Sequence, residues 1–146
     1  AILLFFLFFF ASGYTEEYQF YGKHLILSYL DCDPVALRDQ DALHDAMHRA
    51  TEATGVTILS YTEYSFDPEG YTEVLLLSES HASIHTYPDK NACFVDLFTC
   101  GDSIDMQIFD EMMSSYLKPR NVSGYFLERA EKTVVLPYTF SVIEEN

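Results

Sequence analysis

The order of the predicted helices and strands constrains the fold of this chain most strongly. Segments rich in β-branched and aromatic residues predict strands at about residues 24–30, 56–66, 72–78, 83–87, 93–100 and 121–130. Apolar residues at three- and four-residue spacing predict one helix from about Asp39 to Gly55 and a second that Asp102 caps and that ends before Pro119. This order predicts an α+β fold, a two-layer sandwich with a mainly antiparallel sheet and two helices packed on one face.

The length of the chain, 146 residues, fits one folded domain with a single core. We expect that domain at residues 18–130, after an apolar N-terminal segment at 1–17 and before an acidic C-terminal tail at 131–146. The first segment contains the run AILLFFLFFFAS, which is shorter than the ~20 apolar residues that span a bilayer. Two interpretations stay open, part of a targeting element or an apolar packing strand.

Charge and cysteine content narrow the functional classes. The net charge is −15, from 23 acidic against 8 basic side chains, and without a cluster of Lys or Arg the sequence excludes nucleic-acid binding. The three cysteines, Cys32, Cys93 and Cys100, lack the spacing of zinc or CxxC motifs. An odd number of cysteines indicates free thiols in a reducing compartment, so a cytoplasmic location is expected.

A polar cluster, SESHASIHT at residues 78–86, directly follows the apolar run at 74–77. Buried hydroxyls and imidazoles are costly unless they form hydrogen bonds, so this segment either reaches solvent or builds a site. One interpretation is a hydrolase in which Ser80 or Cys100 is the nucleophile and His81 or His85 the base. The GxSxG signature of such enzymes does not accompany these residues.

A second interpretation is a metal face on the first helix. His44 and His48 stand four residues apart, and Glu52 follows four residues later. Because the glutamate of the HExxH motif is missing and the flank is otherwise polar, we expect a solvated surface and no metal site.

A third interpretation is self-cleavage of the backbone. The hydroxyl of Ser80 can attack the carbonyl of Glu79 and turn the amide into an ester. A nearby imidazole can then take the serine Cα proton, so that β-elimination splits the chain and the new terminus hydrolyses to a pyruvoyl group. A serine, a base and an auxiliary hydroxyl all occur in the SESHASIHT cluster.

The run LSESHASIHTYPDKNACFVDLFTCGD at residues 77–102 resembles the short prokaryotic-type S-adenosylmethionine decarboxylases, which are made as proenzymes and depend on a pyruvoyl cofactor. Two further segments, GKHLILSYLDCD at 22–33 and FDPEGYT at 66–72, support the resemblance. It implies autocatalytic cleavage between Glu79 and Ser80, after which Ser80 becomes the covalent pyruvoyl group. That group forms a Schiff base with the amine of S-adenosylmethionine, whose decarboxylation serves spermidine and polyamine biosynthesis.

The resemblance also implies roles for individual residues. His85 acts in processing, and Thr72 stands where the family usually has an assisting serine. Cys100 is the proton donor of catalysis, so Ser80, His85 and Cys100 form the catalytic set. His81 is either structural or shares in processing.

Three substrate-binding positions follow from the same comparison. Phe66 matches the aromatic residue that stacks on adenine, and Tyr87 and Asp89 stand where the family usually shows Trp and Glu. This departure leaves two alternatives open, the same chemistry on arginine or ornithine and an unprocessed ligand-binding pseudoenzyme. Family members of this size imply a homodimer of cleaved protomers with active sites at the interface.

Overall fold

The structure is a computed structural model and describes residues 20–78, 80–101 and 103–141. Within these residues the elements follow in the order β1 (Gly22–Leu30), α1 (Pro34–Arg38), α2 (Gln40–Ala53), β2 (Ile58–Ser65), β3 (Tyr71–Leu77), β4 (Ser80–Tyr87), η1 (Pro88–Lys90), β5 (Ala92–Thr99), α3 (Met106–Leu117), β6 (Asn121–Arg129) and β7 (Thr133–Leu136). The strands form one sheet in the order β2-β3-β4-β5-β1-β6-β7. All neighbouring pairs are antiparallel.

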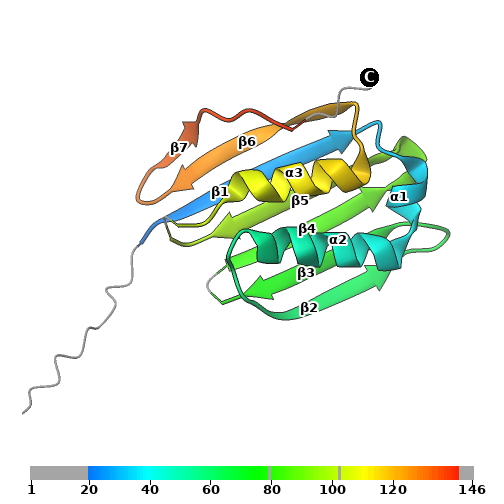
Figure 1. Ribbon diagram of the computed structural model, residues 1–146, viewed down its shortest axis with the longest axis horizontal. Helices are drawn as coiled ribbons and strands as arrows, with labels where there is room; N and C mark the ends of the chain where they lie inside the picture. The colour runs from blue at the N-terminus through cyan, green and yellow to red at the C-terminus, as the bar shows by residue number, and fades with distance from the viewer. Residues whose placement is uncertain (1–19, 79, 102, 142–146) are drawn as a thin grey trace, which may run out of the picture.

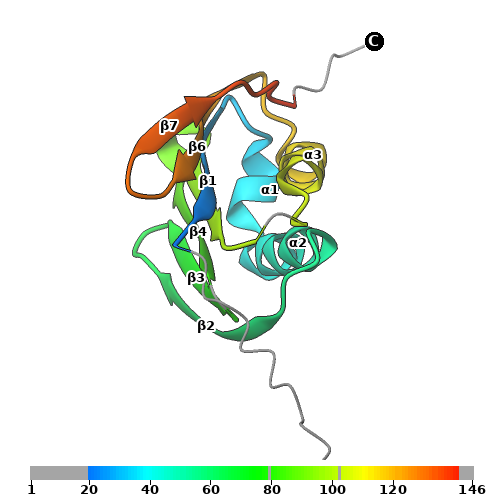
Figure 2. The same cartoon turned by 90° about the vertical axis from the view of Figure 1, so that its left-hand side faces the viewer.

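The molecule has two layers, with all three α-helices on the same face of the sheet (Figures 1 and 2). The core lies between the layers. Leu25 and Leu27 of β1 pack there with Leu43 of α2 and Phe109 of α3, each at most 1% exposed. The predicted α+β sandwich with an antiparallel sheet is confirmed.

Aspartate side chains begin each helix. Asp33 accepts a hydrogen bond from the Val35 amide at the start of α1, and Asp39 accepts one from Ala42 in α2. Asp105 caps α3 through the amides of Gln107 and Ile108. The predicted cap, Asp102, lies outside the described residues. The sequence predicted two helices, and the third, α1, has only five residues, too few for helical periodicity to be recognised.

Part of the predicted C-terminal tail at 131–146 packs against the rest of the domain, and the structure describes it as far as residue 141. β7 pairs with β6, and beyond it the Ser141 amide donates to Asp110 Oδ2 at 2.8 Å. Asp110 is fully buried in α3 and also accepts from the hydroxyls of Tyr29, at 2.6 Å, and Tyr138, at 3.3 Å. Burial and the neighbouring Asp110 raise the pKa of Tyr29, which keeps its hydroxyl a donor. A buried carboxylate that needs several donors therefore holds this segment.

Among the residues that the structure describes, we find no helix long and apolar enough to cross a membrane.

Gly124 marks the closest approach of two strands. It pairs with Leu27, and a Cβ at this position would stand 1.9 Å from the Ile26 carbonyl oxygen. We expect Gly124→Ala to force β6 away from β1 and to lower the free energy of unfolding by about 3 kcal/mol. Urea denaturation measures this change. Ser123→Ala, at the neighbouring exposed position, is the control and should change stability by less than about 0.5 kcal/mol. Equal midpoints for the two variants would contradict the close approach.

Candidate active site

Thr72, His81 and His85 lie on the sheet face that carries no helices. Side chains alternate between the faces of a strand. In β4 the positions of Ala82, Ile84 and Thr86 are buried under the helices, whereas His81 and His85 point to the opposite face and are at least partly accessible. The polar cluster predicted from the sequence is therefore a strand whose imidazoles lie on the open side of the sheet.

Thr72 and His85 form a pair on this face. They are directly opposite each other in the β3–β4 ladder, and Thr72 Oγ1 is hydrogen-bonded to His85 Nδ1. When His85 donates from Nδ1, its Nε2 keeps a lone pair and can accept a proton. The hydroxyl and the base predicted to act together are thus in contact.

Aromatic rings surround His85. The Phe66 ring lies 5.7 Å from it between centroids, and the Tyr87 ring lies 4.8 Å from it. Tyr64 extends the group, 4.8 Å from Phe66. Two of the three predicted substrate-binding residues, Phe66 and Tyr87, therefore flank the same imidazole.

The third predicted substrate-binding residue, Asp89, lies in η1, two residues beyond Tyr87. Its carboxylate is 68% exposed and 3.5 Å from Lys90 Nζ. Asp89 therefore pairs with Lys90 at the surface.

Ser80 and Cys100 lie at the other end of the sheet. The β4–β5 ladder begins at the pair His81–Phe98, and each of the two residues stands within two positions of this pair. Ser80 is half-buried and opens β4, directly after Glu79, which lies outside the described residues. Ser80 and His85 stand five positions apart in β4, which corresponds to about 17 Å. One chain therefore holds the predicted residues in two separate groups.

A second polar cluster, not predicted from the sequence, lies beside the Ser80 end. Asp96 Oδ2 accepts from Ser83 Oγ at 2.6 Å, and Asp96 Oδ1 lies 3.3 Å from His24 Nε2 and 3.8 Å from His81 Nε2. Burial alone would raise the pKa of Asp96, but the hydrogen bonds from His24 and Ser83 lower it below its usual value. The sequence did contain a signal for this cluster. Asp96 lies within the apolar strand CFVDLFTC, and a half-buried charge in such a strand requires polar partners.

The other two cysteines are structural. Cys32 and Cys93 are buried, and the hydrogen bond between them together with burial raises the pKa of Cys93 well above its usual value. Cys100 is free and half-buried. It is therefore the thiol with access to a ligand.

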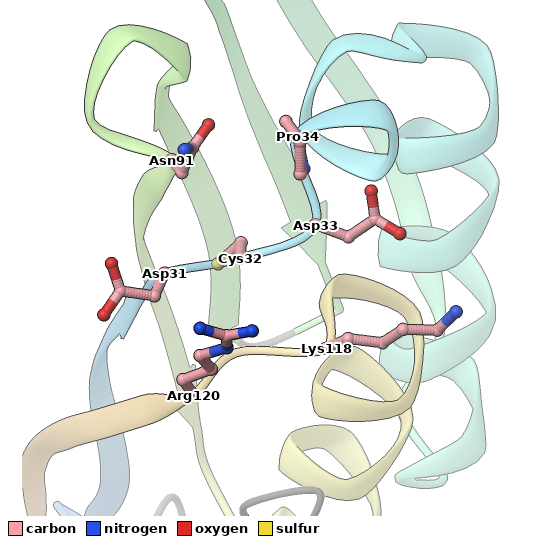
Figure 3. A pocket seen from close by; sticks show the side chains of 7 residues that line it. All are labelled: Asp31, Cys32, Asp33, Pro34, Asn91, Lys118 and Arg120. Carbon is pink, nitrogen blue, oxygen red and sulfur yellow. The ribbon is translucent and has the colours of Figure 1, made fainter. Parts of the chain in front are cut away.

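A pocket of about 470 Å³ lies at the opposite end of the sheet from Ser80 (Figure 3). Asp31 and Asp33 line it after β1, and Lys118 and Arg120 line it between α3 and β6. The backbones of Asp31, Asn91 and Lys118 have φ values of 53°, 49° and 48°, which non-glycine residues adopt rarely. None of the predicted site residues lines this pocket.

Known proteins of one family resemble this chain. The family model described as S-adenosylmethionine decarboxylase matches residues 23–130. A Bacillus cereus protein named S-adenosylmethionine decarboxylase proenzyme 2 is 40% identical over 106 residues, which cover 73% of this chain and 86% of the relative. The S-adenosylmethionine decarboxylase proenzyme of Brevibacillus brevis is 39% identical over 123 residues, covering 83% of this chain and 92% of the relative.

A solved structure agrees with these relatives. The crystal structure of the adenosylmethionine decarboxylase from Aquifex aeolicus matches with a TM-score of 0.70 and 25% identity, covering 85% of this chain and 100% of that chain. The family match and the curated relatives both extend over the segments that carry Thr72, Ser80, His85 and Cys100. The chain therefore belongs to the S-adenosylmethionine decarboxylase family.

Proposed function

We propose that this chain is a self-cleaving proenzyme that decarboxylates S-adenosyl-L-methionine to the aminopropyl donor of spermidine synthesis. The observation that carries the proposal is the hydrogen-bonded pair of Thr72 and His85, with the rings of Phe66 and Tyr87 in contact with His85. A base, an auxiliary hydroxyl and an aromatic binding surface occur together in a chain of this family.

The processing step assigns a role to each residue. The Ser80 hydroxyl attacks the Glu79 carbonyl, and the amide between them becomes an ester. The imidazole of His85 removes the Cα proton of residue 80 through Nε2. The Cβ–Oγ bond then breaks, its electrons leave with the Glu79 carboxylate, and a dehydroalanine remains. Water adds, ammonia leaves, and the terminus is a pyruvoyl group. The Thr72 hydroxyl orients His85 through Nδ1.

The position of Ser80 fits this modification. It is the first residue of β4 and is half-buried, and the turn residue Ser78 stands two positions before it. A residue at this place can change from serine to a ketone without a cavity opening in the core. The pyruvoyl carbonyl supplies the electron sink that decarboxylation of an α-amino acid requires.

The remaining residues serve binding and proton delivery. Phe66 and Tyr87 offer aromatic faces for a planar base, with Tyr87 in place of the usual tryptophan, and Asp89 can accept hydrogen bonds from ribose hydroxyls. Cys100 delivers a proton to the carbon that loses carbon dioxide. The names of the relatives and this aromatic surface favour S-adenosylmethionine over arginine or ornithine.

We also propose that the protein is a homodimer of cleaved protomers with shared active sites. The open sheet face carries apolar side chains that are 37% to 61% exposed, namely Ile26, Val74, Leu76, Phe94 and Tyr125. An exposed apolar face of this kind marks an interaction surface. A second copy related by a two-fold axis brings the Ser80 and Cys100 end of one sheet over the Thr72 and His85 end of the other.

A cytoplasmic location agrees with the free thiols. Cys32, Cys93 and Cys100 are all unpaired, and reduced cysteines are typical of that compartment.

Cleavage depends on one serine. We expect Ser80→Ala to remain a single chain on a denaturing gel, whereas the unmodified protein gives two fragments and the later one has a pyruvoyl-blocked end. Ser78→Ala, two residues earlier and exposed, is the control and should be cleaved normally. Cleavage that persists in Ser80→Ala would refute the assignment of the bond.

Substitutions of Thr72 test the role of its hydroxyl in self-cleavage. Thr72→Val keeps the shape but removes the hydroxyl that orients His85, and we expect self-cleavage to slow by about 100-fold or more. Thr72→Ser restores the hydroxyl and should cleave at least as fast as the unmodified protein. A gel time course after rapid synthesis measures both rates. Equal rates for valine and serine at this position would exclude the role.

Substrate choice is tested by carbon dioxide release. With carboxyl-labelled S-adenosylmethionine, arginine and ornithine, we expect turnover of S-adenosylmethionine alone. Cys100→Ala should still be cleaved but release carbon dioxide about 100-fold more slowly, whereas Cys93→Ala should keep its activity. Turnover of only arginine or ornithine would contradict the proposed substrate.

The shared site predicts complementation between two inactive variants. Ser80→Ala lacks the cleavable serine, and His85→Ala lacks the base, so each should stay uncleaved alone. When both are produced together, the His85→Ala chain should be cleaved because its partner supplies His85. An uncleaved mixture that forms stable dimers would rule out a site shared in this way.

A further inference from the structure

Two imidazoles and a buried carboxylate meet on the other face of the sheet, under α2. His44 and His48 stand one helical turn apart, with ring centroids 4.1 Å from each other. Glu73 reaches them from β3, and its Oε1 lies 2.7 Å from His44 Nδ1 and 3.1 Å from His48 Nε2. Three potential metal-ligand atoms therefore lie within 4.8 Å of one another.

The hydrogen bonding of this cluster is incomplete. Glu73 is 0% exposed, and its Oε2 has no hydrogen-bond partner. His44 Nδ1 is also buried without a hydrogen bond, because its close approach to Glu73 lacks the required orientation. An unpartnered buried carboxylate oxygen is costly. A cation between these atoms would use the free lone pairs.

We propose that His44, His48 and Glu73 bind a divalent transition-metal ion, for which zinc is the best match. Two imidazoles and one carboxylate are a common zinc donor set with a fourth position for water. Zinc with bonds of about 2.0–2.1 Å holds tetrahedral ligand atoms about 3.3 Å apart. The distances from Glu73 Oε1 to His44 Nδ1, 2.7 Å, and to His48 Nε2, 3.1 Å, would lengthen by about 0.6 and about 0.2 Å to reach this geometry.

The surroundings support a cation. The Tyr61 ring packs against both imidazoles, at 4.8 Å from His44 and 5.2 Å from His48, and limits their rotation. A second carboxylate, Glu63, lies 3.6 Å from His44 Nδ1. Its Oε2 accepts from the Tyr71 hydroxyl at 2.6 Å, which holds it at the edge of the cluster. Two carboxylates and two imidazoles make the site favourable for a positive ion.

The sequence alone pointed to a different third residue and to no metal site. Glu52 follows His48 by one helical turn but is exposed, whereas Glu73 comes from β3, far along the chain. Its neighbour Thr72 points to the opposite face and contacts His85. A metal ion at Glu73 therefore ties α2 to the strand that carries the processing hydroxyl.

The second cluster of potential metal ligands, His24, His81 and Asp96, is less suited to bind a cation. Both oxygens of Asp96 have partners, and Arg129 Nη1 lies 3.3 Å from His24 Nδ1. A fixed guanidinium beside the imidazole opposes a cation.

Cobalt and zinc titrations of chelator-treated protein test the proposal. We expect one equivalent of cobalt to give the visible absorption of a tetrahedral site and zinc to displace it. Zinc at 100-fold above its dissociation constant should raise Tm by about 5–10 °C. Glu73→Gln and His48→Gln should each abolish the binding of one equivalent of cobalt and the zinc-dependent rise in Tm. The matched control Glu52→Gln should retain both the bound cobalt and the rise in Tm.

Several outcomes would overturn the site: no zinc-dependent rise in Tm, binding that survives in Glu73→Gln and His48→Gln, or loss of binding in Glu52→Gln. Circular dichroism establishes that each variant is folded. His48 is partly exposed, so His48→Gln decides the question even where Glu73→Gln fails to fold. Self-cleavage at Ser80 needs none of these residues, so the result is independent of the proposed activity.

Discussion

The alternation of side chains across one antiparallel sheet determines where the rest of this molecule lies. Thr72 and Glu73 are neighbours in β3, yet one contacts His85 on the open face and the other lies under α2. A slip of one residue in the β3–β4 register would exchange these faces and expose Leu75 and Leu77. The apolar positions of each strand therefore fix the placement of the chemical groups as strictly as they fix the core.

The same alternation underlies the proposal that two chains share each active site. Three α-helices cover one face, and the other face keeps exposed apolar side chains such as Leu76 and Phe94. Ser80 and His85 share a strand, so their separation of about 17 Å cannot close without disrupting the sheet. In the proposed dimer, a second sheet laid on the open face would bring such groups together and would cover the apolar surface in the same step.

The sequence predicted the elements that depend on local residue patterns. It missed the elements and side-chain partners that depend on contacts between residues far apart in the chain. Alternating and helical periodicity located the long strands and the helices α2 and α3. The family resemblance, through the segments at 66–72 and 77–102, implied that Thr72 and His85 act together, and the structure places them in contact. β7 was missed because it has only four residues, and its partner β6 and the buried Asp110 hold the segment. The partners of Asp96 and Glu73 come from other elements, so only the strand register reveals them.

Glu73 is a buried carboxylate on the core face of β3, and it has no role in the proposed catalysis. Leu75 and Leu77 occupy the same face of β3 and stabilise the core by burial. A carboxylate in that row is costly to bury, and burial raises its pKa although His44 and His48 oppose the change. A buried ion pair seldom stabilises more than an apolar residue of similar size. Metal binding does stabilise, because the ion binds only the folded arrangement. The carboxylate is therefore better explained as a ligand than as a structural ion pair.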